Sequence, residues 1–295
     1  MTGTRRHLVF VLLGAVSLLV GWRPLVATFS LALNQQEYTH ILLVLPVSAM
    51  LLVRECRDQR LPAKPGFGAG GSLMALALLI GLFSNVRLVD LAADVQRCLE
   101  MVALVTWWVG AFVLCFGVKA ARALIFPLCF LYWLVPFPDV MLSRMVAWLQ
   151  QGSSSAAYLM FVAAGVPVNG DGVILSIPGL TLEVAKECSS IRSSLMLIVT
   201  TMVLAQVALH SVWRKAVLVA VAIPLSIAKN GFRIFMLGML ATRVDPGFLT
   251  GNLHHHGGFV FFSVALAVVF LLLWILRRSE GRVANPVSAG VVGLA

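Results

Sequence analysis

Long apolar runs separated by short polar clusters dominate the sequence. Eight of these runs approach the roughly 20 residues that a helix needs to cross a bilayer. The predicted spans are residues 8–25, 38–53, 68–85, 99–117, 120–136, 189–210, 215–240 and 257–276. In lipid the backbone must satisfy its own hydrogen bonds, so these runs are predicted to be helices. The pattern therefore indicates an all-α polytopic membrane protein, with one integral-membrane domain over residues 1–282 and a short tail over 283–295.

The interval 137–188 is the longest stretch between predicted spans. Pro136 and Pro138 end the fifth span, because proline removes a helical hydrogen bond. Residues 140–164 are apolar but are interrupted by glutamines, a glycine and serines, which favours an amphipathic or re-entrant helical pair. Residues 166–182 carry an Asn-Gly-Asp-Gly turn signal between β-type runs and predict a small hairpin.

Composition and charge agree with a membrane protein. The chain is 60% hydrophobic and 12% charged, whereas soluble domains carry about 25% charged residues. Its net charge is +10, but the basic residues lie beside the ends of spans, so a lipid bilayer and not nucleic acid is the expected partner. The basic clusters are Arg5–Arg6, Arg54–Lys64, Lys119–Arg122, Arg214–Lys215 and Arg277–Arg282.

One orientation puts all of these basic clusters on the cytoplasmic side. It needs an even number of spans and an N-terminus inside the cell. Both termini are then cytoplasmic, and the interval 137–188 lies on the extracytoplasmic side of the membrane. The hairpin predicted over residues 166–182 would lie on that outer face.

Cys188 stands where a polar stretch, residues 183–190, meets the apolar run 191–209. The N-terminus of a helix carries partial positive charge, which favours the nucleophilic thiolate. Ser189, the next residue, is of the type that caps helix starts. Cys188 is therefore a candidate nucleophile on the predicted outer face.

The other four cysteines have different settings. Cys115 and Cys129 lie in the middle of apolar runs and are interpreted as packing residues, and Cys56 lies on the predicted cytoplasmic side. Cys98 lies on the same predicted side as Cys188, so a disulfide between the two is a structural alternative.

Arg233 lies about seven residues from the outer end of the seventh predicted span, or roughly 10 Å. An arginine this deep in an apolar helix is costly and indicates a functional site; an ion pair within the bundle is the structural alternative. Asn230 lies three residues earlier on the same helix face. His254, His255 and His256 open the eighth span on the same predicted side. The topology thus predicts that a thiol, a guanidinium and an imidazole meet at one membrane face.

Other functions fit some of these residues. The run His254–His256 is compatible with a zinc-dependent intramembrane protease. However, adjacent helical residues point about 100° apart, so one metal ion cannot easily bind all three histidines. No acidic residue or cysteine pairs with them at metal-ligand spacing, so no metal or cofactor is expected. A transporter with Arg233 in its substrate path is a second alternative, and a structural assembly factor is a third.

The motifs resemble those of the exosortase/archaeosortase family. They are Glu187-Cys188-Ser189-Ser190-Ile191-Arg192, Asn230-Gly231-Phe232-Arg233-Ile234, Leu253-His254 with Gly258 and Phe262, Tyr38-Thr39-His40, and Pro136 with Pro138. The resemblance implies a cysteine enzyme of the inner membrane, a thiol protease or a transpeptidase analogous to sortases. Its implied partners are exported proteins with a C-terminal sorting signal: a Pro-Glu-Pro motif, a transmembrane helix and a basic tail.

The resemblance also implies roles for single residues. Cys188, Arg233 and His254 correspond to the catalytic set, and the implied reaction passes through a thioester acyl-enzyme. Ser190 stands where the family usually has glycine. The acceptor of the acyl group is left open between water, an amine and a lipid-linked group. The supporting residues are Asn230, Ser189, Arg192, His255, His256 and His40.

We expect a membrane-impermeant thiol reagent to label Cys188 in intact spheroplasts, because the charge pattern puts it on the outer face. Variants that keep a single cysteine isolate each thiol, and a substrate peptide should block the labelling of Cys188. Cys56 is the control, since it should react only after permeabilisation. Labelling of Cys188 only in permeabilised cells would contradict the predicted topology.

Overall fold

The computed structural model describes residues 3–58, 64–86, 91–184, 191–245 and 252–283. The chain divides into two compact units, Met1–Leu142 and Ser143–Ala295. The single domain predicted over residues 1–282 stays a prediction.

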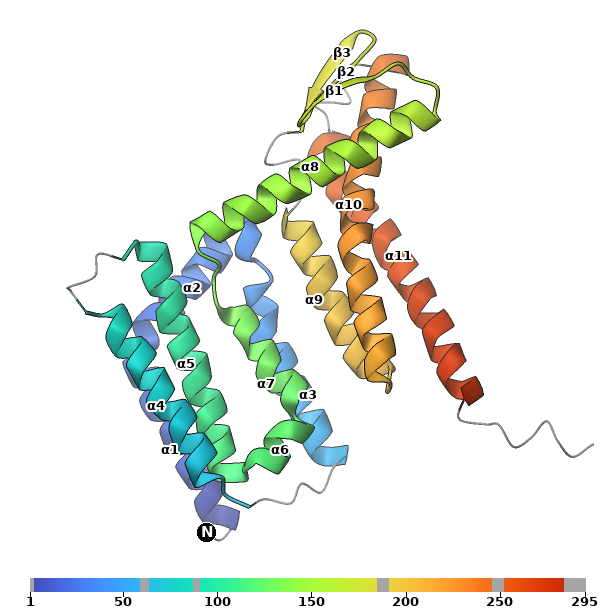
Figure 1. Cartoon of the computed structure of the whole chain (residues 1–295). Helices are drawn as coiled ribbons and strands as arrows, with labels where there is room; N and C mark the ends of the chain where they lie inside the picture. Colours follow the sequence, from blue (N-terminus) through green and yellow to red (C-terminus); the bar gives the residue numbers. More distant parts are fainter. Residues whose placement is uncertain (1–2, 59–63, 87–90, 185–190, 246–251, 284–295) are drawn as a thin grey trace, which may run out of the picture. The chain divides into compact units, whose positions relative to one another are not determined.

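The first unit consists of helices (Figure 1). The long ones are α1 (Gly3–Val20), α2 (Trp22–Asn34), α3 (Ile41–Asp58), α4 (Phe67–Ser84) and α5 (Ala93–Phe116). The shorter ones are α6 (Val118–Ala123), α7 (Ile125–Phe130) and the single turns η1 (Gln36–Tyr38) and η2 (Leu131–Leu134). The first predicted span is longer than expected and bends by 71° between α1 and α2. The fifth, predicted over residues 120–136, is broken into α6, α7 and η2.

The second unit contains most of α8 (Asp139–Ala163), three short strands and three long helices. The strands are β1 (Asn169–Asp171), β2 (Ile174–Ile177) and β3 (Leu180–Glu183). The helices are α9 (Ile191–Ala208), α10 (Val212–Arg243) and α11 (Asn252–Val283).

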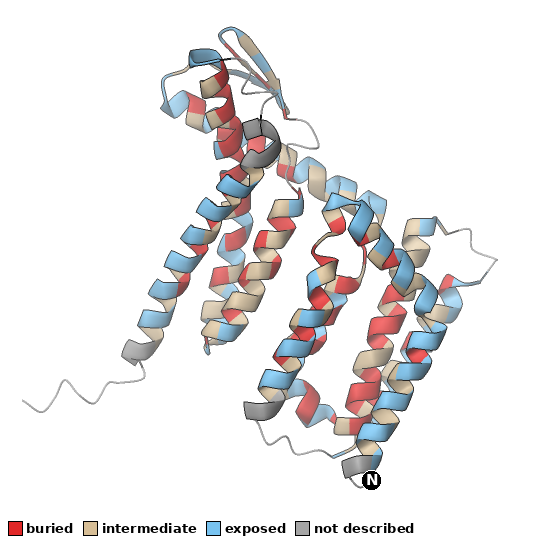
Figure 2. Ribbon diagram, turned by 180° about the vertical axis from the view of Figure 1, so that it is seen from behind, coloured by how far each residue is buried: buried red, intermediate tan, exposed pale blue. Residues whose placement is uncertain are grey.

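The described helices are suited to a membrane. Six are long and apolar enough to cross one, or up to eight spans exist if each of two bent helix pairs counts as one. Many large apolar side chains of these helices are exposed, among them Phe259, Leu271 and Trp274 of α11, and Figure 2 shows exposed positions along the helices. Such surfaces suit lipid and not water. The prediction of an all-α polytopic membrane protein is confirmed.

Helices α4 and α5 lie side by side and approach closely at two glycines (Figure 1). A Cβ on Gly70 would overlap the backbone of Leu114, and one on Gly110 would lie 2.9 Å from Cγ of Met74. Small residues at such crossings let helix backbones pack in direct contact, which drives helix association in lipid. Helix α1 is attached to α5 by the indole of Trp108, which donates to the Ser17 hydroxyl at 2.8 Å.

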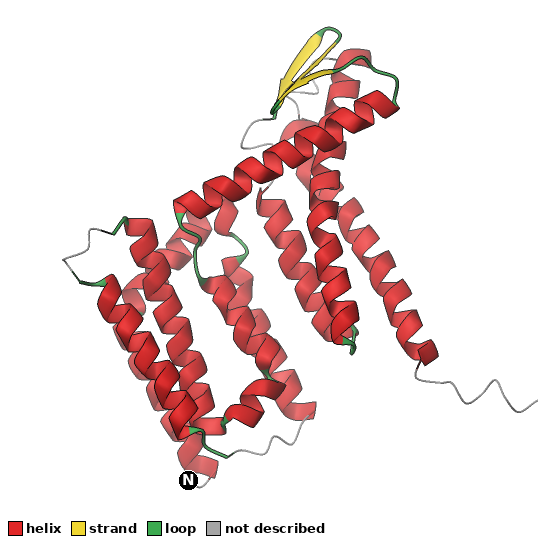
Figure 3. Cartoon of the chain, viewed as in Figure 1, coloured by secondary structure: helices red, strands yellow, loops and turns green. Residues whose placement is uncertain are grey.

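The predicted hairpin is a three-stranded antiparallel sheet (Figure 3). The Asn-Gly-Asp sequence that indicated a turn forms β1, and the first turn follows it at Gly172, with φ +59°. A second turn lies at Pro178-Gly179, where Gly179 has φ +81° and joins β2 to β3. A proline before a glycine of positive φ is the signature of a type II turn, and our prediction of one hairpin missed it.

The helical pair predicted over residues 140–164 is one continuous helix of 25 residues, α8. The polar residues that indicated a break are accommodated within it. Gly152 packs against Ile227 of α10, where an added Cβ would lie 3.2 Å from the isoleucine Cγ2. A glycine costs a helix interior about 1 kcal/mol relative to alanine, and this contact explains why it is kept there.

Helices α9, α10 and α11 share an apolar core at the end of the unit away from the sheet. Its members are Leu197, Ala205, Leu209, Leu218, Ala265, Val269 and Leu273. Beside this core, Glu280 of α11 accepts the backbone N–H of Ser211 at 2.7 Å and lies 3.5 Å from Arg214. A carboxylate at the start of α10 satisfies an otherwise unpaired donor there.

We expect Gly70→Ala to destabilise the first unit by about 1–3 kcal/mol, because the new methyl group must push α5 away from α4. Thermal unfolding of the purified protein in detergent measures the change. Gly71→Ala is the matched control, since nothing lies within 4 Å of a Cβ at that position. Equal Tm values for the two variants would contradict the close packing of α4 against α5.

Candidate functional site

Helix α8 presents a buried stripe of polar and then apolar residues to the rest of the second unit. Gln150, Ser153 and Ser154 occupy one face, and Ala157 and Phe161 continue it. Among these five, all but Gln150 are buried. Helix α8 therefore faces its neighbours with hydrogen-bonding groups at one end of the stripe and packing groups at the other.

Two of these polar side chains hold the sheet. The Ser154 hydroxyl donates to the carbonyl of Gly172, in the first turn of the sheet, at 2.9 Å. The Gln150 amide donates to the carbonyl of Val184, directly after β3, at 2.9 Å. Val184 is the last described residue before the segment 185–190. Helix α8 thus fixes the point from which the chain continues towards Cys188.

Helices α8 and α10 cross in direct contact. A Cβ on Gly231 would lie 2.6 Å from the Cβ of Ala156, and one on Gly238 would lie 2.8 Å from the ring of Phe161. Next to Gly231, the Asn230 amide donates to the Ser153 hydroxyl at 2.9 Å. Both Asn230 and Ser153 are 0% exposed. Asn230, predicted as a supporting residue, is therefore a buried link between α10 and α8.

Two buried cations share one face of α10. Lys229 is 7% exposed and Arg233 is 9% exposed, and they lie four residues apart. The Lys229 ammonium donates to the hydroxyl of Ser193, in the first turn of α9. Our prediction put Arg233 about seven residues from the outer end of its span. Because α10 continues to Arg243, the arginine lies ten residues from the helix end, or about 15 Å, instead of seven.

Helices α9 and α10 run antiparallel, as two cross-links between them show. Lys215 donates to Gln206 at 2.8 Å near the loop, and Lys229 bonds Ser193 further along. The direction from Ser193 to the start of α9 is therefore the same as the direction from Lys229 to Arg233 along α10. The guanidinium lies on the side from which the chain enters α9.

Helix α11 is attached to α10 beside Arg233. The rings of Phe232 and Phe261 pack edge to face with centroids 5.9 Å apart. His254–His256 lie in the first turns of α11, five to seven residues before Phe261, or about 8–10 Å along the axis. Their side chains lie outside the described part of the structure.

The predicted site residues are thus only partly described. Asn230 and Arg233 lie together on α10, and Arg192 is exposed in the first turn of α9. Cys188 and Ser189 lie outside the described residues. The meeting of thiol, guanidinium and imidazole stays a prediction.

Three residues of this site were missed by our sequence analysis: Lys229, Ser193 and Ser153. Lys229 lies one turn before Arg233, so the helical period alone places both cations on one face. Ser153 belongs to the polar stripe of α8, whose spacing of three and four residues was visible in the sequence. Ser193 carried no signal, because a serine near the start of a membrane helix is unremarkable.

Cys98, Cys115 and Cys129 are free thiols. Cys98 is one of them, so the structure does not contain the disulfide with Cys188 that we considered. Cys115 is buried, as expected of a packing residue, but Cys129 is exposed on α7. The packing role predicted for Cys129 is therefore wrong, since the side chain faces away from the core. Within the described residues no three His, Cys, Asp or Glu side chains are arranged to hold a metal ion.

His40, predicted as a supporting residue, lies in the first unit and is 1% exposed. Its Nδ1 lies 3.2 Å from the Glu37 carbonyl, and its ring packs edge-on against Trp133. Nearby, the Tyr38 hydroxyl donates to the Phe137 carbonyl at 2.9 Å. The Tyr38-Thr-His40 sequence is thus joined to the chain between Pro136 and Pro138.

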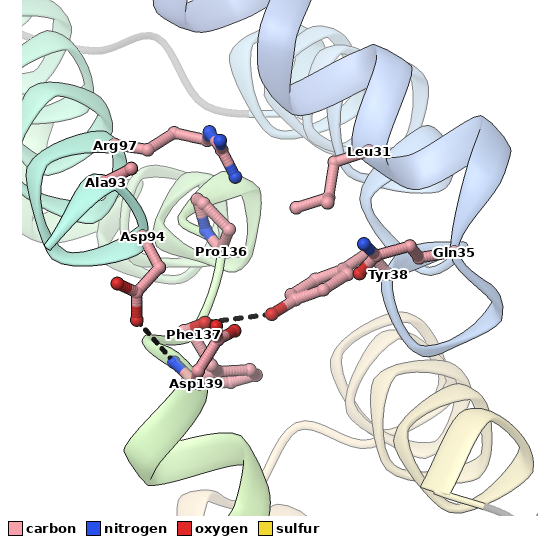
Figure 4. A pocket seen from close by; sticks show the side chains of 9 residues that line it. All are labelled: Leu31, Gln35, Tyr38, Ala93, Asp94, Arg97, Pro136, Phe137 and Asp139. Atoms are coloured by element: carbon pink, nitrogen blue, oxygen red, sulfur yellow. Dashed lines mark hydrogen bonds between the residues drawn. The ribbon is translucent and has the colours of Figure 1, made fainter.

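A half-open cavity of about 360 Å³ lies beside this junction in the first unit (Figure 4). Its lining residues are Leu31, Gln35, Tyr38, Ala93, Asp94, Arg97, Pro136, Phe137 and Asp139. The Asp94 carboxylate accepts the backbone N–H of Asp139 at 2.7 Å and so caps the start of α8. The carboxylate of Asp94 in this cavity is therefore explained by its capping of α8. The hydroxyl of Tyr38 is explained by its hydrogen bond to the Phe137 carbonyl.

A family model described as transmembrane exosortase matches residues 32–271. The matched range contains Cys188, Arg233 and His254–His256, and it includes parts of both units. Searches of curated proteins and of solved structures found no match.

We expect Asn230→Ala to destabilise the second unit by about 1–3 kcal/mol, because the buried Ser153 hydroxyl loses its donor. Thermal unfolding in detergent measures this. Ser153→Ala should cost a similar amount, and the double variant should cost less than the sum. The control is Ser155→Ala, whose exposed hydroxyl bonds only a carbonyl of its own helix. Strictly additive costs would show that the two side chains are not coupled.

Proposed function

The chain belongs to the transmembrane exosortase family, and from this premise we propose that it is a membrane cysteine peptidase or transpeptidase. Its substrates are exported proteins that end in a Pro-Glu-Pro motif, a transmembrane helix and a basic tail. The enzyme cleaves this sorting signal on the extracytoplasmic face of the inner membrane. Family membership supports a role in protein sorting at a membrane; the substrate motif and the face are parts of the proposal.

One observation carries the proposed chemistry: α10 bonds the first turn of α9 through Lys229 and buries Arg233 one turn further along. Ile191, where α9 begins, is the third residue after Cys188. Lys229 bonds Ser193, and Arg233 lies one turn further along α10, in the direction from which the chain enters α9. This geometry supports a shared site for Cys188 and Arg233.

The proposed reaction begins with the Cys188 thiolate attacking the scissile carbonyl. A tetrahedral oxyanion forms, and the Arg233 guanidinium stabilises it; this interaction is strong because the arginine is buried away from water. The C–N bond then breaks, His254 protonates the leaving amine, and a thioester acyl-enzyme remains. An incoming nucleophile gives its proton to His254, attacks the thioester and releases the thiolate.

The sheet supports a role in substrate docking. It is held on α8 by Ser154 and Gln150, and Leu182 of β3 lies against Gly238 of α10. We propose that the substrate enters beside this sheet with its transmembrane helix in the bilayer. No described residue favours the transporter or the zinc protease over this reaction.

We expect Cys188→Ala to leave a tagged sorting-signal substrate uncleaved in cells at normal enzyme level. Arg233→Lys should also fail, because a point charge does not reproduce the planar guanidinium. His254→Ala should lose processing while His255→Ala keeps it. Immunoblotting of substrate and product measures each outcome.

Cys129→Ala is the matched control, because that thiol is exposed on α7 of the first unit. It should process the substrate as well as the unaltered enzyme. Normal processing by Cys188→Ala would end the proposal of a cysteine nucleophile, and loss with His255→Ala but not with His254→Ala would reassign the base.

A further inference from the structure

The ammonium of Lys229 is buried with little to neutralise it. It has three N–H donors, and in the described part of the chain its one hydrogen-bond partner is the Ser193 hydroxyl. The described residues place no carboxylate within ion-pair distance of it. A hydroxyl satisfies one donor but carries no negative charge. Burying a charge on such terms is strongly unfavourable.

Arg233 adds to that cost. Side chains four residues apart are neighbours on a helix, and like charges at that spacing repel. Lys229 also does not escape by reaching solvent, because only 7% of it is exposed. Its other buried neighbour on the helix, Asn230, is neutral and bonds Ser153. The ammonium of Lys229 therefore suits an anionic group from elsewhere.

We propose that Lys229 binds a carboxylate of the substrate, and that this carboxylate is the glutamate side chain of the sorting motif. The inference rests on the function proposed above. Arg233 serves the reacting carbonyl, and Lys229 serves recognition. An acidic side chain satisfies the ammonium donors that Ser193 leaves unused and offsets the repulsion between the two cations.

The spacing of the two cations suits this division. One helical turn separates them by about 5–6 Å along α10. An extended peptide advances about 3.3 Å per residue, so that spacing corresponds to roughly two residues of substrate. A glutamate on Lys229 then leaves a backbone carbonyl one or two residues away facing Arg233. The scissile bond is accordingly expected within about two residues of the glutamate.

The test compares three substrates that differ only at the central residue of the motif: glutamate, glutamine and lysine. Initial processing rates are measured in cells with the unaltered enzyme, Lys229→Met and Lys229→Arg. The unaltered enzyme should prefer glutamate over glutamine on the order of tenfold, the scale of a hydrogen bond to a charged group, and should process the lysine substrate least. Lys229→Met should process all three at similar, reduced rates, and Lys229→Arg should restore the preference.

Lys215→Met is the matched control. Lys215 is on the same helix and also bonds a side chain of α9, Gln206, at 2.8 Å, but it lies near the opposite end of α10 from Arg233. It should keep the full preference for glutamate. Lys229→Gln replaces Lys229→Met if the latter does not reach the membrane in normal amount.

The outcomes separate the inference from the proposed function. If the unaltered enzyme leaves the glutamate substrate uncleaved, the proposed function fails. If it cleaves that substrate but Lys229→Met still prefers glutamate over glutamine, the assignment of Lys229 fails alone. Equal rates for glutamate and lysine substrates with the unaltered enzyme also overturn the assignment, without any need for a variant.

Discussion

The direct crossing of α8 and α10 is the constraint on which the second unit depends. It requires Gly231 and Gly238, because a Cβ at either position would collide with α8 or the sheet. At the same place Asn230 bonds Ser153, and both are fully buried. In lipid, helices gain little from burying apolar surface, so close backbone packing and hydrogen bonds between helices decide which faces meet. Once this crossing forms, the stripe on α8 is oriented, and the sheet and the end of β3 take their positions from it.

The crossing also determines where charge can be buried. With Asn230 turned towards α8, its neighbour Lys229 faces α9 and bonds Ser193, and Arg233 follows one turn later. The same helix therefore carries a neutral amide that links it to α8 and two buried cations one turn apart. A well-packed apolar side chain at a buried ionic position is often as stable as the charge or more so. The buried ammonium of Lys229, whose described partner is a hydroxyl, is better explained by what it binds than by what it stabilises.

The sequence was sufficient for the class of fold but not for its local detail. Apolar runs located α3, α4, α5, α9, α10 and α11, because a span needs only length and hydropathy to be recognised. The hairpin prediction lacked the third strand because a Pro178-Gly179 turn inside an apolar run was read as strand. The helical pair was wrong because Gly152 lies inside one helix, where it packs against Ile227. Arg233 could be identified from its position deep within an apolar helix. Ser193 could be identified only once the structure showed that its face of α9 meets Lys229 of α10. The placement of Cys188 beside Arg233 remains a prediction.

The motif residues of the first unit make different kinds of contact from those of the second unit. In the first unit, Tyr38 and His40 meet the Pro136–Pro138 segment through a hydrogen bond to Phe137 and through ring packing, which are contacts that hold a chain in place. In the second unit, the motif on α10 includes a residue that links helices, Asn230, and a buried cation, Arg233. Resemblance to a family marks both kinds of residue equally, so it does not distinguish scaffold from chemistry. Burial together with the bonding partner does: the buried amide of Asn230 bonds a neighbouring helix and supports the fold, whereas the buried ammonium of Lys229, one turn from Arg233, has a hydroxyl as its described partner and is the group that we propose meets an anionic substrate.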